Sequence, residues 1–291
     1  MKFNNSDQLR SFLKKEANRL GISITSAYKT YFARTFLENI SKYVNDNRII
    51  CKGSSAELAY LGKMVRVITD IDLATIYNHR EIISDLINSF SEHSNGIKFE
   101  MNAPIKQTNT GIYQFSILGC LDKTKQQIGM DFQENYSRLI EEQWRIVPPI
   151  FEGDKSFEVC LPSFEEFLAE KLCIILETNK PDVLNTRVKD FYDIYQLHGS
   201  NYDPDKFTEY FQKIIRLRNK ITIEKADTTM FDKEFIEKHK EQWEIAVKKY
   251  EFLDKSVDLE CAVYYSRGVA REQLQKAGQK TNEDISLVKK R

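Results

Sequence analysis

The sequence predicts an α+β protein, with a small mixed sheet flanked by helices in its first part and a helical second part. Short runs rich in β-branched residues fall between residues 48 and 134, and such runs predict strands. From residue 164 onward, apolar residues recur every three or four positions, which is typical of helices that bury one face. The 291-residue chain is long enough for two ordinary domains.

The first part is expected to begin with two helices and then to mix strands with short helices. Ser6 is a candidate N-cap and Gly21 a stop signal for the first helix. The polar residues 122–126 are the predicted turn between the last two strands. In order, we expect helices at 6–21 and 26–44, a strand at 48–53, a short helix at 54–62, a strand at 65–77, a helix at 81–93, and strands at 111–121 and 126–134.

A stretch with Pro148, Pro149 and Gly153 is the predicted boundary between two domains, 1–150 and 151–291. The second domain has strong helical periodicity. Its expected helices span 164–177, 185–199, 204–221 and 231–253.

Composition excludes several classes of function. Lys and Arg together number 43, as do Asp and Glu, so the formal net charge is zero and nucleic-acid contact would need a local basic patch. No apolar run approaches the roughly 20 residues that span a bilayer, and the first ten residues lack the apolar core of a signal peptide. Five widely spaced cysteines without a CxxC pair, and four scattered histidines, indicate reduced thiols in a cytoplasm and argue against zinc.

Two aspartates, Asp70 and Asp72, interrupt the apolar strand "VRVITDIDLATIY". Residues two apart in a strand point to the same face, so the two carboxylates repel each other unless a cation intervenes. Mg²⁺ or Mn²⁺ is the usual partner for such oxygens. Asp131, in the later strand "QQIGMDFQE", would reach the same metal if the two strands are neighbours. The alternative is a pair of surface aspartates at a strand end.

Gly53 and Ser54 stand between a strand and a helix, just before this pair. Glycine lets backbone approach a ligand closely, and a helix N-terminus with hydroxyl groups suits a phosphate. Ser54 as an ordinary N-cap is the alternative. Together with the two aspartates, the segment predicts a phosphate cradle facing a metal pair, the layout of nucleotidyltransferases. Arg66 is a weaker candidate for contact with a triphosphate.

The chain resembles the AbiEii/AbiGii toxin family, nucleotidyltransferase-like toxins of bacterial type IV toxin–antitoxin and abortive-infection systems. The resemblance rests on "KGSSAELAY", "RVITDIDL", "FEEFLAEKL" and "RVKDFYDIYQL", in that order. It implies a nucleotidyltransferase-like N-terminal domain and a nucleoside triphosphate (NTP) as donor. It also implies an RNA acceptor, the 3′ end of tRNA, whose modification blocks translation and growth in phage defence, and a cognate antitoxin as partner.

Lys171 lies inside the apolar face of the helix predicted at 164–177. A lysine that faces a core needs an anion, which a triphosphate, Asp190 or Asp193 would supply. The resemblance assigns Lys171 and Asp190 to the active site, where Asp190 would orient Lys171 or take a proton from the attacking hydroxyl. The alternatives are that Lys171 snorkels to the edge or pairs structurally, and that Asp193 forms a helix-surface salt bridge.

A local basic patch follows in "QKIIRLRNK", which contains Lys213, Arg216, Arg218 and Lys220. The patch is either a solvated helix face or a contact surface for an RNA backbone.

The sequence therefore predicts a metal-dependent nucleotidyltransferase toxin in which Asp70, Asp72 and Asp131 hold the metal. Two other functions stay open. One is a catalytically inactive nucleotide-binding module on the same scaffold, and the other is a metal-dependent phosphohydrolase or nuclease, because carboxylate pairs serve those enzymes as well.

Overall fold

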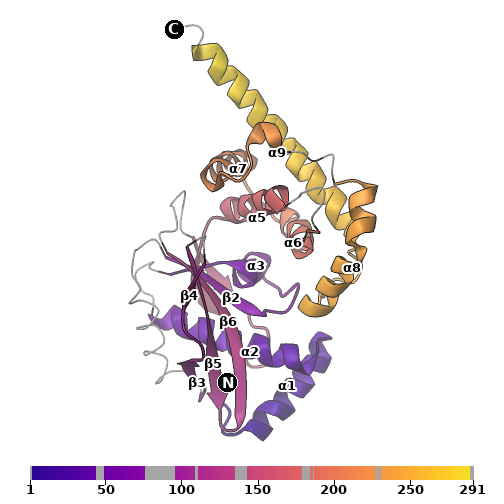
Figure 1. The fold of residues 1–291 in the computed structure, drawn as a ribbon. Coiled ribbons are helices and arrows are strands. Elements are labelled where there is room, and N and C mark those ends of the chain that lie inside the picture. Colours follow the sequence, from indigo (N-terminus) through magenta and orange to yellow (C-terminus); the bar gives the residue numbers. More distant parts are fainter. Residues whose placement is uncertain are drawn as a thin grey trace. The chain divides into compact units, whose positions relative to one another are not determined.

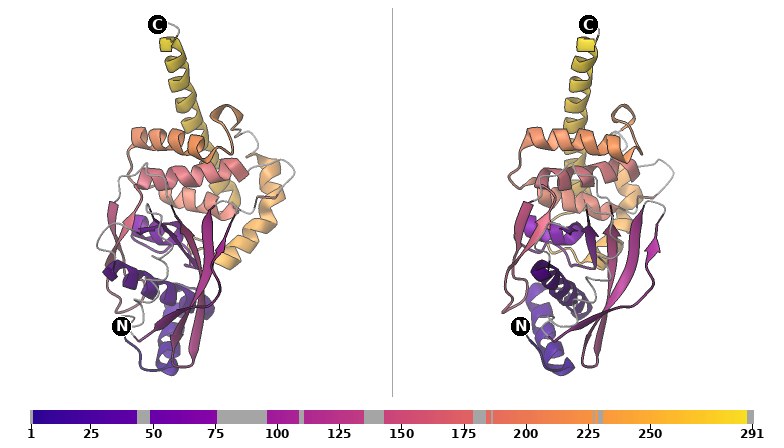
Figure 2. Two further views of the ribbon diagram at one scale, coloured as in Figure 1. Left: turned by 60° about the vertical axis from the view of Figure 1, so that its left-hand side comes forward. Right: turned by 90° about the vertical axis from the view of Figure 1, so that its left-hand side faces the viewer.

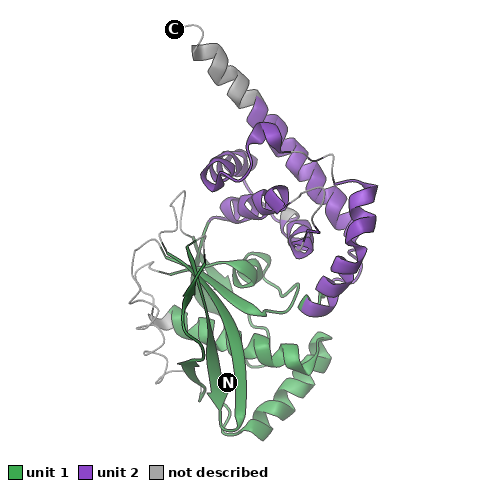
Figure 3. Ribbon diagram, in the orientation of Figure 1, with its two compact units in different colours: residues 1–162, 250–253 green, residues 163–249, 254–291 purple. Residues whose placement is uncertain are grey.

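A computed structural model describes the protein in two compact units (Figure 3). Unit 1 comprises Met1–Pro162 and Tyr250–Leu253, and unit 2 comprises Ser163–Lys249 and Asp254–Arg291. The described residues are 2–43, 49–75, 96–108, 111–134, 143–178, 184–185, 187–226, 228 and 231–288. The helix predicted at 81–93 lies outside them.

Unit 1 is built on a mixed sheet, as predicted (Figure 1). Its described strands follow the order β1-β2-β6-β5-β3, with β4 paired to β5; β2 and β6 are parallel, and the other pairs are antiparallel. A separate hairpin, β7–β8, completes the unit. The elements are α1 (Ser6–Leu20), α2 (Ile24–Tyr43), β1 (Ile50–Cys51), α3 (Gly53–Leu61), β2 (Asp70–Ala74), β3 (Lys98–Met101), β4 (Lys106–Gln107), β5 (Ile112–Leu121), β6 (Thr124–Gln133), β7 (Gln143–Val147) and β8 (Phe157–Leu161).

The N-cap residue of helix α1 lies one position earlier than the sequence suggests. The N-cap is Asn5, whose side chain accepts a hydrogen bond from the Gln8 N–H, whereas the Ser6 hydroxyl accepts from the backbone of the β5–β6 turn. Gly21 ends the helix in the left-handed conformation, as predicted. The prediction of Ser6 as N-cap was wrong because its hydroxyl serves a long-range contact that local spacing does not reveal.

The core of unit 1 lies between the helix pair α1–α2 and one face of the sheet (Figure 2). Phe32 and Phe36 of α2 are fully buried there. Phe32 fits because Gly119 of β5 has no side chain, since a Cβ at that position would lie 2.4 Å from the Phe32 ring. Phe36 meets Phe99 of β3 edge to face.

The hairpin β7–β8 runs through the predicted domain boundary. Gln143 pairs with Leu161 and Val147 with Phe157, so a division at residue 150 would cut the hairpin, and unit 1 instead continues to Pro162. The prolines and Gly153 that suggested a boundary form the turn of this hairpin.

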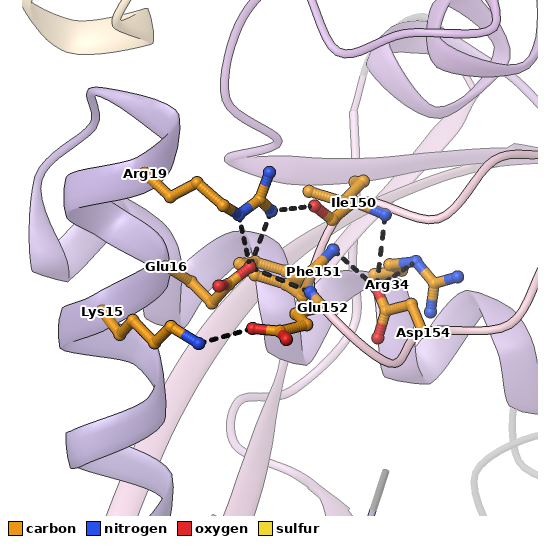
Figure 4. A network of polar contacts seen from close by, with 8 residues as sticks. All are labelled: Lys15, Glu16, Arg19, Arg34, Ile150, Phe151, Glu152 and Asp154. Carbon is orange, nitrogen blue, oxygen red and sulfur yellow. Dashed lines mark hydrogen bonds and ion pairs between the residues drawn. The ribbon is translucent and has the colours of Figure 1, made fainter.

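Charged residues of α1 and α2 anchor that turn (Figure 4). Glu16 accepts a hydrogen bond from the Glu152 N–H, and Arg19 pairs with Glu16 and donates to the Ile150 carbonyl. Arg34 lies 3.1 Å from Asp154, and both side chains are buried. The turn is therefore held by charged residues of two helices, and of their ion pairs Arg34–Asp154 is buried.

A short segment far along the chain returns to unit 1. The Val67 N–H donates to the Tyr250 carbonyl, and the Leu253 N–H donates to the Val65 carbonyl. The Glu251 carboxylate accepts from the Ser23 backbone and the Ser26 hydroxyl at the start of α2. The strand predicted at 65–77 therefore begins its regular pairing only at Asp70, and the helix predicted at 231–253 ends at Tyr250 because residues 251–253 pair with unit 1.

Unit 2 is helical, as predicted. Helix α5 packs against α6 and α7, and α6 packs against α9. Aromatic rings of α6, α8 and the segment before α8 meet in its core at Phe191, Phe231 and Phe235. The elements are α5 (Phe164–Thr178), α6 (Val188–His198), α7 (Pro204–Arg218), the short 3₁₀ helix η1 (Ile223–Lys225), α8 (Lys233–Tyr250) and α9 (Leu259–Val288).

Candidate functional site

Three half-buried carboxylates lie on one face of the sheet in unit 1. Asp70 and Asp72 are on β2, where they alternate with the buried Ile71. Strand β6 runs parallel beside β2, and Asp131 is the registered partner of Asp72, with Gly129 opposite Asp70. Registered residues of neighbouring strands point to the same side, so the expectation that Asp131 lies beside the pair is confirmed.

Gly53 begins α3 directly against the Asp72 carboxylate. Its φ of +57° is a left-handed conformation, and a Cβ at this position would lie 1.8 Å from Asp72 Oδ2. The backbone N–H of Lys52 donates to the Asp72 carbonyl over 2.8 Å. Glycine is therefore required twice here, for its conformation and for the close approach of helix and carboxylate.

The first turn of α3 carries two serine hydroxyls that make no hydrogen bond among the described residues. Its N-cap is Lys52, which provides no side-chain cap, so Ser54 is not an N-cap and that alternative is wrong. The hydroxyls of Ser54 and Ser55 are buried and have no hydrogen-bond partner among the described residues. Together with the backbone N–H groups of the first turn, they form a set of donors suited to an anion.

The carboxylates fit a hard divalent cation by their chemistry, since Asp70 and Asp72 offer oxygen donors on one face with Asp131 beside them. The side chains do not already converge: within the described part of the chain, no group of three His, Cys, Asp or Glu residues has the spacing of a metal site. Asp131 Oδ1 accepts instead from the Gln114 amide at 3.1 Å, and Asp70 Oδ1 from the Thr69 hydroxyl at 3.2 Å.

Arg66 lies inside unit 1 with 3% of its surface exposed. Its guanidinium is 3.3 Å from Glu57 of α3, which is also buried, and it stacks on the Tyr250 ring with 5.6 Å to the ring centre. Contact between Arg66 and a triphosphate stays a prediction. Sequence reasoning missed Glu57, although a carboxylate in the otherwise apolar "SSAELAYL" was a signal, and it missed Tyr250, which no motif marks.

In unit 2, Lys171 is buried and lies between two acids of α6. Its Nζ is 2.5 Å from Asp193 and 3.5 Å from Asp190, and 5.2 Å from the Phe167 ring centre. Asp193 is fully buried and Lys171 is 6% exposed, so the surface salt bridge and the snorkelling lysine are both wrong. The anion that meets Lys171 in this structure comes from α6, and the catalytic roles of Lys171 and Asp190 stay predictions.

The basic patch on and after α7 is largely neutralised by acids. Arg218 makes two hydrogen bonds to Glu177, at 2.6 and 2.9 Å, and Lys220 lies 3.8 Å from the same carboxylate. Lys213 pairs with Glu209 one turn earlier. Arg216 is exposed, and no ion pair of Arg216 falls among the described residues. The assignment of these four residues to RNA stays a prediction.

Solved structures of two bacterial proteins share this fold. MenT4, a nucleotidyltransferase toxin from Mycobacterium tuberculosis, aligns with a TM-score of 0.58 and 16% identity over 92% of this chain and 98% of its own. JHP933 from Helicobacter pylori aligns with a TM-score of 0.51 and 16% identity over 91% and 98%. A sequence identity of 16% shows only that the fold is shared. No curated protein sequence matches the chain.

None of the helices in the described part of the chain is both long and apolar enough to cross a membrane.

The profile of the family described as nucleotidyl transferase AbiEii toxin, type IV toxin–antitoxin system, matches residues 35–267, which is most of the chain. The resemblance seen in the four sequence motifs is thereby confirmed, and the chain belongs to the AbiEii family of nucleotidyltransferase toxins.

Proposed function

We propose that this toxin transfers a nucleotide from an NTP to an RNA acceptor, the 3′ end of tRNA, and thereby blocks translation. One observation carries the proposal. Asp72 and Asp131 are registered partners on parallel strands, with Asp70 on the same face, and the start of α3 lies against Asp72 at Gly53. Carboxylates beside a helix N-terminus with unused donors suit a metal–triphosphate group.

In this proposal Asp70 and Asp72 hold Mg²⁺ or Mn²⁺, with Asp131 as the third carboxylate. The ion, when bound, neutralises phosphate charge and orients the attacking oxygen. The alternative role of Asp131 is that of the base that accepts the proton of the acceptor hydroxyl, with its Oδ1 oriented by the Gln114 amide.

Gly53 and Ser54 bind the triphosphate. The missing Cβ of Gly53 lets the helix start lie directly against the Asp72 carboxylate, so the triphosphate and its metal meet there, and the unpartnered Ser54 hydroxyl donates to a phosphate oxygen. In unit 2, Lys171 neutralises charge that develops on the leaving pyrophosphate. Asp190 and Asp193 hold the Lys171 ammonium group in place, with their carboxylates 3.5 and 2.5 Å from its Nζ.

The biological setting is the remaining part of the proposal. A type IV toxin–antitoxin system implies a cognate antitoxin. We assign the toxin to the cytoplasm, where tRNA and NTPs occur, and to abortive infection as a phage defence. Lys213, Arg216, Arg218 and Lys220 are assigned to the RNA backbone, and Arg216 is exposed without an acid paired to it among the described residues.

Product analysis tests the proposal. Purified protein is incubated with Mg²⁺, total tRNA and each labelled NTP in turn, with Asp72→Asn as the inactive control. Labelled RNA that is longer than the input supports transfer. Shortened RNA would instead identify a nuclease, and unchanged RNA with a bound NTP would identify a binding module.

A further inference from the structure

Arg66 joins three parts of unit 1 that are distant in the sequence. It stands in the segment that leads into β2, shortly before Asp70. Its guanidinium reaches Glu57, one turn inside α3, and covers the ring of Tyr250. Both charged side chains are at most 2% exposed. Such a pair costs desolvation energy on both sides, and the attraction between the two charges, 3.3 Å apart, offsets part of that cost.

The contact between Arg66 and Glu57 joins the two parts of the proposed site, which are the segment leading to Asp70 and the start of α3. Glu57 follows Gly53 by one helical turn, so fixing Glu57 fixes the start of α3. Arg66 precedes Asp70 in the same chain segment, whose backbone is held on both sides of Arg66: the Val65 carbonyl accepts from Leu253, and the Val67 N–H donates to Tyr250. The segment 250–253 therefore supports Arg66 by its ring and by its backbone.

The distance between these halves has little tolerance. The Gly53 Cα lies so near the Asp72 carboxylate that a single added methyl group would fall 1.8 Å from Oδ2. A small displacement of α3 along β2 would close the room beside the carboxylate or widen it. Misplacement of about 1 Å costs on the order of 10²-fold in rate in well-aligned sites.

We propose that Arg66 is a positioning residue that sets the first turn of α3 against the Asp70–Asp72 pair, through Glu57 and with Tyr250 as its support, and that it makes no contact with the triphosphate. This inference rests on the proposed function, since it concerns the same site. It changes the expected role of Arg66 from a ligand of the nucleotide to a link within the protein.

The test is a double-mutant cycle on the buried pair. Arg66→Met and Glu57→Met each remove one member of the buried pair and should each lower kcat at least tenfold, with the KM for NTP within threefold of the wild type. The double variant Glu57→Met/Arg66→Met removes both charges of the pair and replaces them with two apolar stems, and it should recover kcat to within fivefold. An Arg66 that binds phosphate would give a different pattern: a raised KM for NTP in Arg66→Met, no recovery in the double variant, and a nearly normal Glu57→Met.

Three further variants separate positioning from general stability. Arg34→Met breaks another buried arginine–carboxylate pair of unit 1, with Asp154, and should lower the melting temperature while kcat stays normal. Tyr250→Phe keeps the ring under Arg66 and should behave as wild type, whereas Tyr250→Leu should lower kcat. If the variants at Arg66 and Glu57 lower only the melting temperature, as Arg34→Met does, the positioning role is overturned.

Amide hydrogen exchange provides a readout that does not depend on turnover. Exchange at Glu57–Leu61 and Val67 should be faster in Arg66→Met and return to wild-type rates in the double variant, while α1 is unaffected. If the wild type transfers no nucleotide to any RNA, the proposed function fails, and this exchange pattern still decides the positioning role. Unchanged exchange in Arg66→Met would overturn it.

Discussion

Asp72 has two neighbours that restrict it at once. Its carboxylate lies against the Cα of Gly53, and its carbonyl accepts from the Lys52 N–H. The side chain therefore lies against the start of α3, on the face of the sheet that it shares with Asp70 and Asp131. At the scale of single residues, the site depends on the Asp72 carboxylate and on the absence of a side chain at Gly53.

Replacing either aspartate by asparagine keeps the shape and removes the charge. Asp72→Asn and Asp70→Asn should each lower nucleotide transfer more than about a hundredfold, or ~2.7 kcal/mol in the barrier. The melting temperature should stay equal or rise slightly, because repulsion between the carboxylates is relieved. Asp122→Asn, in the β5–β6 turn, is the matched control and should transfer normally. Full activity of Asp72→Asn with normal metal dependence would remove the metal assignment.

The two left-handed glycines at the ends of α3 allow a matched comparison. Gly62→Ala should cost only backbone strain, about 1 kcal/mol, because a Cβ there meets nothing within 4 Å. Gly53→Ala carries the same strain and in addition collides with Asp72, so transfer should fall at least tenfold, ~1.4 kcal/mol. Activity measured against melting temperature for both variants checks this, and equal effects of the two would refute the close-approach argument.

At the scale of secondary-structure elements, buried polar contacts hold the helices of unit 2 together. Helices α5 and α6 are joined by a lysine between two buried acids, and the loop before α6 is held by His239 of α8, whose Nε2 accepts from the Asn185 N–H over 2.8 Å. Polar groups buried between helices are expensive unless they are fully paired, so each of these contacts fixes one arrangement of the helices.

Lys171→Met tests the first of these contacts. Removing the cation leaves Asp190 and Asp193 buried together, which should lower the free energy of unfolding by about 3–5 kcal/mol. If Lys171 also meets the leaving pyrophosphate, transfer should lose a further ~2–4 kcal/mol of transition-state stabilisation. Assays well below the melting temperature, beside unfolding curves, separate the two effects. A Lys171→Met protein that is less stable but fully active would refute the catalytic role.

His239 should make the stability of unit 2 depend on pH. Burial lowers the pKa of His239, and its Nδ1–H donates to the Phe235 carbonyl while Nε2 accepts from Asn185, which requires the neutral ring. With a folded pKa below the unfolded value of about 6.5, the unfolded chain binds more protons, so stability is complete above that pH and falls as pH drops below it. Urea unfolding at pH 7.5 and 5.5 should give a larger loss for the wild type than for His239→Leu. An equal loss would contradict this.

Local patterns were sufficient to predict that Asp70 and Asp72 share one face of a strand, but not the contacts around them. The period of two in "TDIDL" and the short turn before the strand of Asp131 are signals that lie within a few residues, whereas the pairing of that strand with β2 joins distant segments and required the tertiary structure. The partner of Arg66 could not be predicted in the same way, since Tyr250 is far away in sequence and "YEFLD" has the apolar pattern of a helix end. For Lys171, the sequence showed that a buried lysine needs an anion, but the choice among its candidate partners required the tertiary structure.

Considered as a whole, the molecule has no net charge, so any attraction to RNA must come from local patches. The structure also distinguishes the members of the basic patch. Arg218 is bound to the buried Glu177, whereas Arg216 is exposed.

Arg216→Ala should therefore weaken tRNA binding and flatten its salt dependence by about one unit of slope, since one fewer phosphate contact releases fewer counterions. Arg218→Ala should chiefly lower stability, because Glu177 loses its bidentate partner. Binding of NTP should be unchanged in Arg216→Ala. Titration of tRNA at several salt concentrations measures both slopes, and equal slopes for wild type and Arg216→Ala would identify the patch as a solvated helix face.

The return of residues 250–253 to unit 1 also sets an order of events during synthesis. A ribosome that has translated the first 162 residues has supplied every described strand, yet Val65, Val67 and Ser23 still lack their partners. These partners are made only after the helices α5 to α8. Domains made first usually fold first, but unit 1 is complete only when residues 250–253 have also been made. A chain that ends before residue 250 therefore lacks the contacts that hold the segment leading to Asp70, and the proposed site is complete only after α8 has been made.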